Sequence, residues 1–153
     1  MFTHILVPLD GSTLAEAVLP AVAYLARTLD ARITLLHVIE HNAPDAVHGQ
    51  RHITDVAEGA AYLAAVARTL PPGLQVEEHV HPNQEHNVAR SIAAHAEELG
   101  VDLIAMCTHG RGSVRRWLFG TIAQKVLALG DTPVLLAPGP DPNADPAVDP
   151  AGR

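Results

Sequence analysis

The feature that most constrains the fold is a regular alternation of short apolar runs with amphipathic stretches. The runs that are rich in Val, Ile and Leu are typical of buried strands, and the stretches between them have helical periodicity. The predicted strands cover residues 3–9, 31–40, 74–82, 101–107 and 132–138. The predicted helices cover residues 12–29, 55–70, 86–99 and 121–129. This β-α-β-α-β-α-β-α-β order predicts an α/β domain in which helices cover both faces of a parallel sheet.

Local signals refine the helices. Thr13 is followed three residues later by Glu16, which predicts a capping box at the start of the first helix. Pro20 lies inside the same pattern and is expected to kink that helix. Gly100 follows the third helix at the position where a left-handed residue commonly ends a helix. The polar stretch from residue 41 to about 54 is rich in His, Asn and Gly, and we interpret it as a loop whose role the sequence does not indicate.

Length and charge limit the class of protein. A chain of 153 residues is one domain by length, and its net charge of -7 argues against a general nucleic-acid binder. The single cysteine, Cys107, excludes an internal disulfide. We expect a cytoplasmic protein without membrane association, because neither a signal peptide nor a bilayer-spanning run is apparent. Residues 139–153 are rich in Pro and Asp and are predicted to form a disordered tail after a domain of residues 1–138.

Two loops are candidates for a ligand site. In open sheets of this kind, ligands bind beyond the carboxyl ends of the strands, where the strand order reverses. The sequence "PLDGS" follows the first predicted strand, and "CTHGRGSVRRWLFGT" follows the fourth. If these two strands are neighbours, the two loops face each other across one crevice.

The second of these loops suits a phosphate group. Residues 106–126 hold four of the ten Lys and Arg residues of the chain and no acid. Gly110 and Gly120 allow the backbone to approach an anion closely. Thr121 starts the last helix and forms a second predicted capping box with Gln124, so that free N–H groups and the positive end of the helix dipole point at the loop. The P-loop and dinucleotide-binding glycine patterns are both absent.

The sequence resembles the universal stress proteins over residues 1–138. The segments that carry the resemblance are "ILVPLDGS", "LLHV", "GVDLIAM" and "TPVLLAP". Nucleotide-binding members have G-x-x-G, nine residues and then G-[ST] after the fourth strand. In this chain Gly110, nine residues and the pair Gly120 and Thr121 match, but Cys107 occupies the place of the first glycine.

The resemblance implies a flavodoxin-like three-layer sandwich with a five-stranded parallel sheet of order 3-2-1-4-5. It also implies a stress-response role, a homodimer, and binding of ATP, with AMP or ADP as alternatives and Mg²⁺ possible beside ATP. The strand at Pro133–Ala137 is apolar and is an edge strand in this order, so we expect two copies to pair through it. Asp10 would hydrogen-bond the ribose or adenine, and Val38 would pack on adenine. The candidate nucleotide-binding residues are Pro8, Leu9, Asp10, Val38, Met106, Cys107, His109, Gly110, Arg111, Gly120, Thr121 and Ile122.

Simpler interpretations remain open for several of these residues. Asp10 could serve only to cap the first helix, and Cys107 is more often a small apolar residue at a strand end than a redox centre. If the backbone at Cys107 turns with positive φ, as a glycine would allow, Cys107→Gly is expected to tighten ATP binding. The basic residues of the second loop could form a solvated face.

Alternatives to ATP binding also remain. One is a nucleotide-free dimeric stress protein that acts through protein partners, and another is a slow ATPase, for which His109 is the only candidate base. The ten histidines raise the question of a metal, and His79 and His81 share one strand face. Because no H-E-x-x-H motif or Cys-His set is present, we expect no metal site of the protein's own.

Overall fold

The computed structural model describes residues 1–41, 46–47, 50–108 and 121–139. Its main sheet has five parallel strands in the order β5-β2-β1-β6-β7. Counted along the chain within this sheet, the order is 3-2-1-4-5, which confirms the predicted flavodoxin-like arrangement. The strands are β1 (His4–Pro8), β2 (Arg32–Glu40), β5 (Val76–Glu85), β6 (Leu103–Thr108) and β7 (Val134–Pro138).

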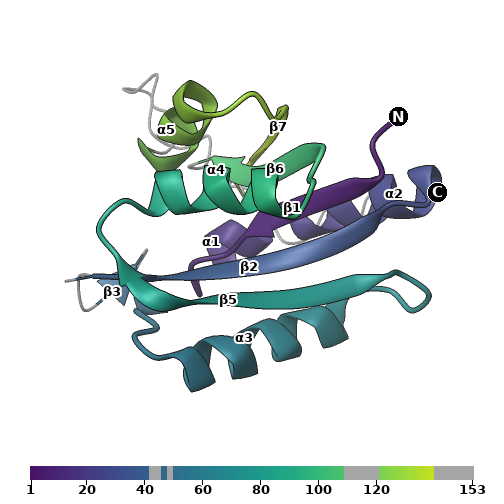
Figure 1. Cartoon of the computed structure of the whole chain (residues 1–153). Helices are drawn as coiled ribbons and strands as arrows, with labels where there is room; N and C mark the ends of the chain where they lie inside the picture. Colours follow the sequence, from purple (N-terminus) through teal and green to yellow (C-terminus); the bar gives the residue numbers. More distant parts are fainter. Residues whose placement is uncertain (42–45, 48–49, 109–120, 140–153) are drawn as a thin grey trace.

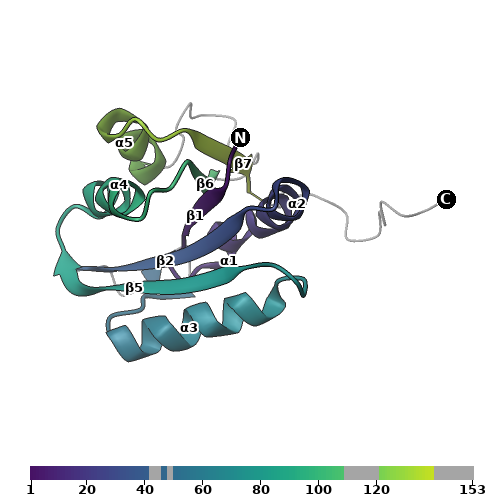
Figure 2. The ribbon, with the colours of Figure 1, turned by 45° about the vertical axis from the view of Figure 1, so that its right-hand side comes forward.

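The helices form a layer on each side of this sheet, as Figures 1 and 2 show for α3 on one side and α4 and α5 on the other. They are α1 (Thr13–Glu16), α2 (Leu19–Leu29), α3 (Val56–Thr69), α4 (Val88–Glu98) and α5 (Thr121–Leu129). Alternate residues of each strand enter opposite cores. Ile5 and Val7 pack with the side chains of α2 and α3, whereas Leu6 packs with those of α4 and α5. The central strands β1, β2 and most of β6 are therefore buried on both faces, whereas the edge strands β5 and β7 are partly exposed.

The first predicted helix is two helices rather than one kinked helix. α1 ends at Glu16, α2 begins at Leu19, and Pro20 lies in the first turn of α2. Proline is compatible with this position because the first turn of a helix needs no intrahelical N–H donor. The predicted capping box was also wrong by one residue: Ser12, not Thr13, caps α1, and its hydroxyl accepts a hydrogen bond from the Ala15 N–H.

Two further boundaries differ from the prediction. The stretch interpreted as a loop contains a short antiparallel pair, β3 (Ala46–Val47) with β4 (Gln50–Arg51). β5 continues to Glu85, three residues beyond its predicted end, and α4 begins at Val88 after the cap residue Asn87. The predicted helix end at Gly100 is confirmed, because this glycine has φ of 64°. The proposed tail falls almost entirely on residues outside the described part of the chain.

The sheet reverses its order beside β1. β1 pairs with β2 on one side, with Ile5 opposite Ile33, and with β6 on the other side, with Ile5 opposite Leu103. The chain therefore leaves the carboxyl ends of β1 and β6 at neighbouring points of one edge. The single crevice predicted from the sequence required these two strands to be neighbours, and they are.

Candidate functional site

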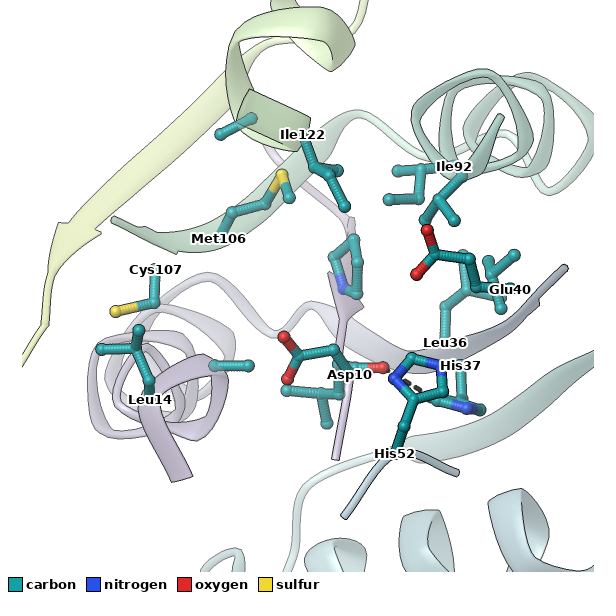
Figure 3. Close-up of a pocket in the computed structure, with 16 residues that line it drawn as sticks. Asp10, Leu14, Leu36, His37, Glu40, His52, Ile92, Met106, Cys107 and Ile122 are labelled. Carbon is teal, nitrogen blue, oxygen red and sulfur yellow. Dashed lines mark hydrogen bonds between the residues drawn. The ribbon is translucent and has the colours of Figure 1, made fainter. Parts of the chain in front are cut away.

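A cavity of about 300 Å³ opens at the carboxyl ends of β1, β2 and β6. Its size falls at the lower end of the range for small-molecule sites, and its walls are largely aliphatic. Figure 3 shows the side chains that surround it. The lining residues are Pro8, Leu9, Asp10, Leu14, Ala15, Leu36, His37, Val38, Glu40, His52, Val88, Ile92, Met106, Cys107, Ile122 and Ala123.

The structure brings together the predicted site residues from β1, β2, β6 and α5. Those that line the cavity are Pro8, Leu9, Asp10, Val38, Met106, Cys107 and Ile122. Thr121 begins α5, but its side chain lies outside what the structure describes. His109, Gly110, Arg111 and Gly120 also lie outside the described residues, and so does the rest of the predicted phosphate loop.

Asp10 is held in place by the turn that follows β1. Its Oδ1 atom accepts hydrogen bonds from the Ser12 N–H at 2.9 Å and from the Ser12 hydroxyl at 2.5 Å. The same hydroxyl accepts from Ala15 at 3.2 Å and thereby caps α1. Gly11 between them has φ of 90°, a conformation that L residues with a side chain rarely adopt. Asp10 therefore supports the cap of α1 while its side chain lines the cavity, so the two interpretations of this residue are compatible.

Two buried histidines lie beside Asp10 (Figure 3). The Nδ1 atom of His37 lies 2.8 Å from the carbonyl oxygen of Leu9 and donates to it, because a carbonyl can only accept. Burial lowers the pKa of His37, and the neighbouring His52 lowers it further. Both ring nitrogens of His52 are buried and have no hydrogen-bond partner among the described residues. The imidazole of His37 is therefore favoured in its neutral form at the wall of the cavity.

Sequence reasoning missed several lining residues, among them His37, Glu40 and His52. His37 and Glu40 belong to the same strand as Val38. Because Val38 was predicted to contact the ligand, its neighbours on the predicted strand could also have been identified as candidates. His52 comes from the segment after β4, where no periodicity exists to indicate its position.

The backbone of Cys107 does not have the positive φ that was considered for it in the sequence analysis. It is a regular residue of β6 opposite Ala137 of β7, and among the described residues the only one other than glycine with positive φ is Asp30. The positive φ on which tighter ATP binding by Cys107→Gly depended is therefore absent at this residue. Burial raises the pKa of the Cys107 thiol, and the carboxylate of Asp10 raises it further. The thiol donates to the carbonyl of Thr108 at 3.3 Å, which agrees with a small packed side chain rather than a reactive thiolate.

The first turn of α5 forms the opposite wall of the cavity through Ile122 and Ala123 (Figure 3). A helix of nine residues begins there. Its first backbone N–H groups have no partners within the helix, and its dipole makes this end partly positive. This end of the cavity is therefore suited to an anion, whereas Asp10 and Glu40 line other parts of the wall.

Two other properties concern the described residues alone. No helix among them is both long and apolar enough to span a membrane. They also contain no group of three or more His, Cys, Asp or Glu side chains arranged to hold a metal ion, although the His95 ring lies 4.9 Å from that of His79 and 5.0 Å from that of His81.

Comparison with known proteins agrees with this architecture. The Bacillus subtilis (strain 168) "Universal stress protein YxiE" is 30% identical over 149 residues, covering 89% of this chain and 99% of the relative. The universal stress protein from Archaeoglobus fulgidus in complex with dAMP superimposes with a TM-score of 0.60 at 20% identity, covering 89% of this chain and 97% of that one.

A universal stress protein solved in complex with cAMP superimposes with a TM-score of 0.59 at 15% identity, covering 91% of this chain and 98% of that one. At these identities the structural matches establish the fold alone. The sequence itself matches the model of the universal stress protein family over residues 1–138, which includes every described strand and helix. The chain belongs to the universal stress protein family.

Proposed function

We propose that this protein binds an adenine nucleotide, with ATP as the physiological ligand, in the cavity at the carboxyl ends of β1, β2 and β6. The observation that carries the proposal is the convergence of predicted residues from four elements on one cavity at the switch point of the sheet. Asp10 supplies a fixed carboxylate, Val38 and Met106 supply apolar contacts, and the first turn of α5 supplies a positive helix end. Family relatives solved with cAMP and dAMP support an adenine base as the ligand.

In this proposal the ligand lies across the carboxyl ends of the strands. The base packs near Val38, and Asp10 accepts hydrogen bonds from the ribose hydroxyls. The phosphates lie at the start of α5, where Gly110, Gly120 and Thr121 would offer N–H and hydroxyl donors. Mg²⁺ would accompany ATP without a dedicated protein site.

We further propose that the protein acts in the stress response as a homodimer through β7. This strand forms one edge of the main sheet, and its residues Val134–Ala137 are only partly buried. An apolar edge strand tends to be covered by another chain, and pairing of two copies about a two-fold axis would cover both edges.

The test of nucleotide binding is to denature the freshly purified protein and to separate the released small molecules by chromatography. Co-purified ATP, ADP or AMP near one mole per mole of chain is the expected result. If no nucleotide is released and added ATP does not bind, the nucleotide-free dimer is the better account. Steady release of ADP from added ATP would support a slow ATPase.

A further inference from the structure

The cavity has a carboxylate at one end of an apolar slot. Leu36, Val38 and Glu40 occupy alternate positions of β2 and therefore share the face that α4 covers. Leu36 and Val38 belong to the core beneath α4, and Glu40 is the last residue of this row. Across the slot, α4 contributes Val88 and Ile92.

The side chain of Glu40 is directed at this slot rather than at solvent. Figure 3 shows its carboxylate pointing into the cavity from beside Ile92. Glu40 is half-buried, and the pairing of β2 with β5 becomes irregular between Val38 and Glu40, where the partners change from His81 to Glu85. The additional residues lie on β5, so β2 keeps its alternation and Glu40 stays on the face of Leu36 and Val38.

The charges of the cavity fix the direction in which a nucleotide can lie. Phosphates are repelled by Glu40 and Asp10 and attracted by the positive start of α5, which Ile122 marks in Figure 3. The base must then occupy the apolar slot between Val38 and Ile92. A flat ring in this slot presents one polar edge to Glu40.

We infer that Glu40 accepts a hydrogen bond from the exocyclic amino group of the base and so makes the site selective for a 6-amino purine over a 6-oxo purine. This inference rests on the proposed function, because it assumes a nucleotide in this cavity. An ionised carboxylate can only accept hydrogen bonds, so an amino group at position 6 is matched and a carbonyl oxygen is repelled. Selectivity of this kind is strong because the mismatched ligand leaves partly buried polar groups unpaired.

The experiment compares the dissociation constants of ATP and inosine triphosphate, which differ in the substituent at position 6 of the purine and in the hydrogen that N1 carries in inosine. Calorimetry is run on the wild-type protein, on Glu40→Gln and on Glu97→Gln. Glu97 is exposed on α4 and lies outside the cavity, so Glu97→Gln removes the same charge elsewhere and serves as the control. The amide in Glu40→Gln can rotate to donate to a 6-oxo group, whereas a carboxylate cannot.

We expect the wild-type protein and Glu97→Gln to bind ATP at least tenfold more tightly than inosine triphosphate. In Glu40→Gln the ratio of the dissociation constant of inosine triphosphate to that of ATP should fall to three or less, mainly because inosine triphosphate binds more tightly. If the wild-type protein binds both ligands within a factor of three, or Glu40→Gln keeps the wild-type ratio, the inference is wrong while nucleotide binding stands. If the wild-type protein binds neither ligand, the proposed function itself fails.

Discussion

Replacing Ser12 by Ala should separate the structural and ligand-positioning roles of the turn after β1. Ser12 is fully buried, and its hydroxyl makes two hydrogen bonds: it donates to Asp10 at 2.5 Å and accepts from Ala15 at 3.2 Å. Loss of an N-cap hydroxyl costs about 0.5–2 kcal/mol. Loss of a hydrogen bond to a charged group costs roughly 1.5–3 kcal/mol. Ser12→Ala should therefore lower the free energy of unfolding by about 2–5 kcal/mol.

For a chain of this size, that loss corresponds to a decrease in Tm of roughly 4–20 °C. Asp10 retains the N–H of residue 12 as a donor but loses the hydroxyl, so its carboxylate is less firmly placed. We expect ATP affinity to fall about tenfold, which is about 1.4 kcal/mol. Differential scanning calorimetry measures the first effect, and titration calorimetry below the Tm of the variant measures the second.

Ser91→Ala is the matched control. Ser91 is also a buried serine, on α4, but its hydroxyl has no hydrogen-bond partner within the part of the chain that the structure describes. Its replacement removes no hydrogen bond and introduces a better helix former, so the Tm should stay constant or rise slightly. If Ser12→Ala lowers the Tm no more than Ser91→Ala does, the argument that Ser12 supports both α1 and Asp10 is refuted.

Three further predictions follow from the described residues. Cys107→Gly should lower the free energy of unfolding by about 1 kcal/mol without tightening ATP binding, because Cys107 lies in a regular strand. Calorimetry that shows tighter ATP binding by the variant would contradict this prediction. Burial lowers the pKa of His37 and His79 below 6.5, so the unfolded chain binds more protons than the folded chain just below pH 6.5. The Tm should therefore fall as the pH decreases from 7.5 to 5.5. A Tm that is constant or higher at pH 5.5 would count against this prediction. Light scattering at micromolar concentration should give twice the chain mass of 16.2 kDa if β7 pairs with a second copy, and a monomer mass would exclude that dimer.

The sheet was predictable because its strands have a strong local signal. Runs such as Ile33–Val38 are buried on both faces and are therefore mostly apolar, and each is separated from the next by a helical pattern. The order of the strands came from the family resemblance and was confirmed. Helix starts were less certain, because Ser12 and Thr13 are adjacent hydroxyl residues and both suit a cap. Ser12 is distinguished by local hydrogen bonds, because its hydroxyl donates to Asp10 two residues earlier and accepts from Ala15.

The candidate site was predictable to the extent that it is built from strand ends. Asp10, Val38 and Met106 each end or follow an apolar run, so topology alone places them at one edge of the sheet. His52 was not predictable, because its position depends on how a polar segment without periodicity packs against His37. The role of Glu40 follows from alternation along β2 only once the cavity is known.

The most direct test of the central claim is a calorimetric titration of nucleotide-free protein with ATP, run in parallel on the wild-type chain and on Asp10→Asn. This substitution preserves the shape of the side chain and one acceptor oxygen for Ser12, but removes the charge that faces the cavity. The account predicts saturable binding of one ATP per chain to the wild type and at least tenfold weaker binding to the variant. Absence of binding heat from the wild type at any temperature tested, in a sample shown to be free of retained nucleotide, would contradict it.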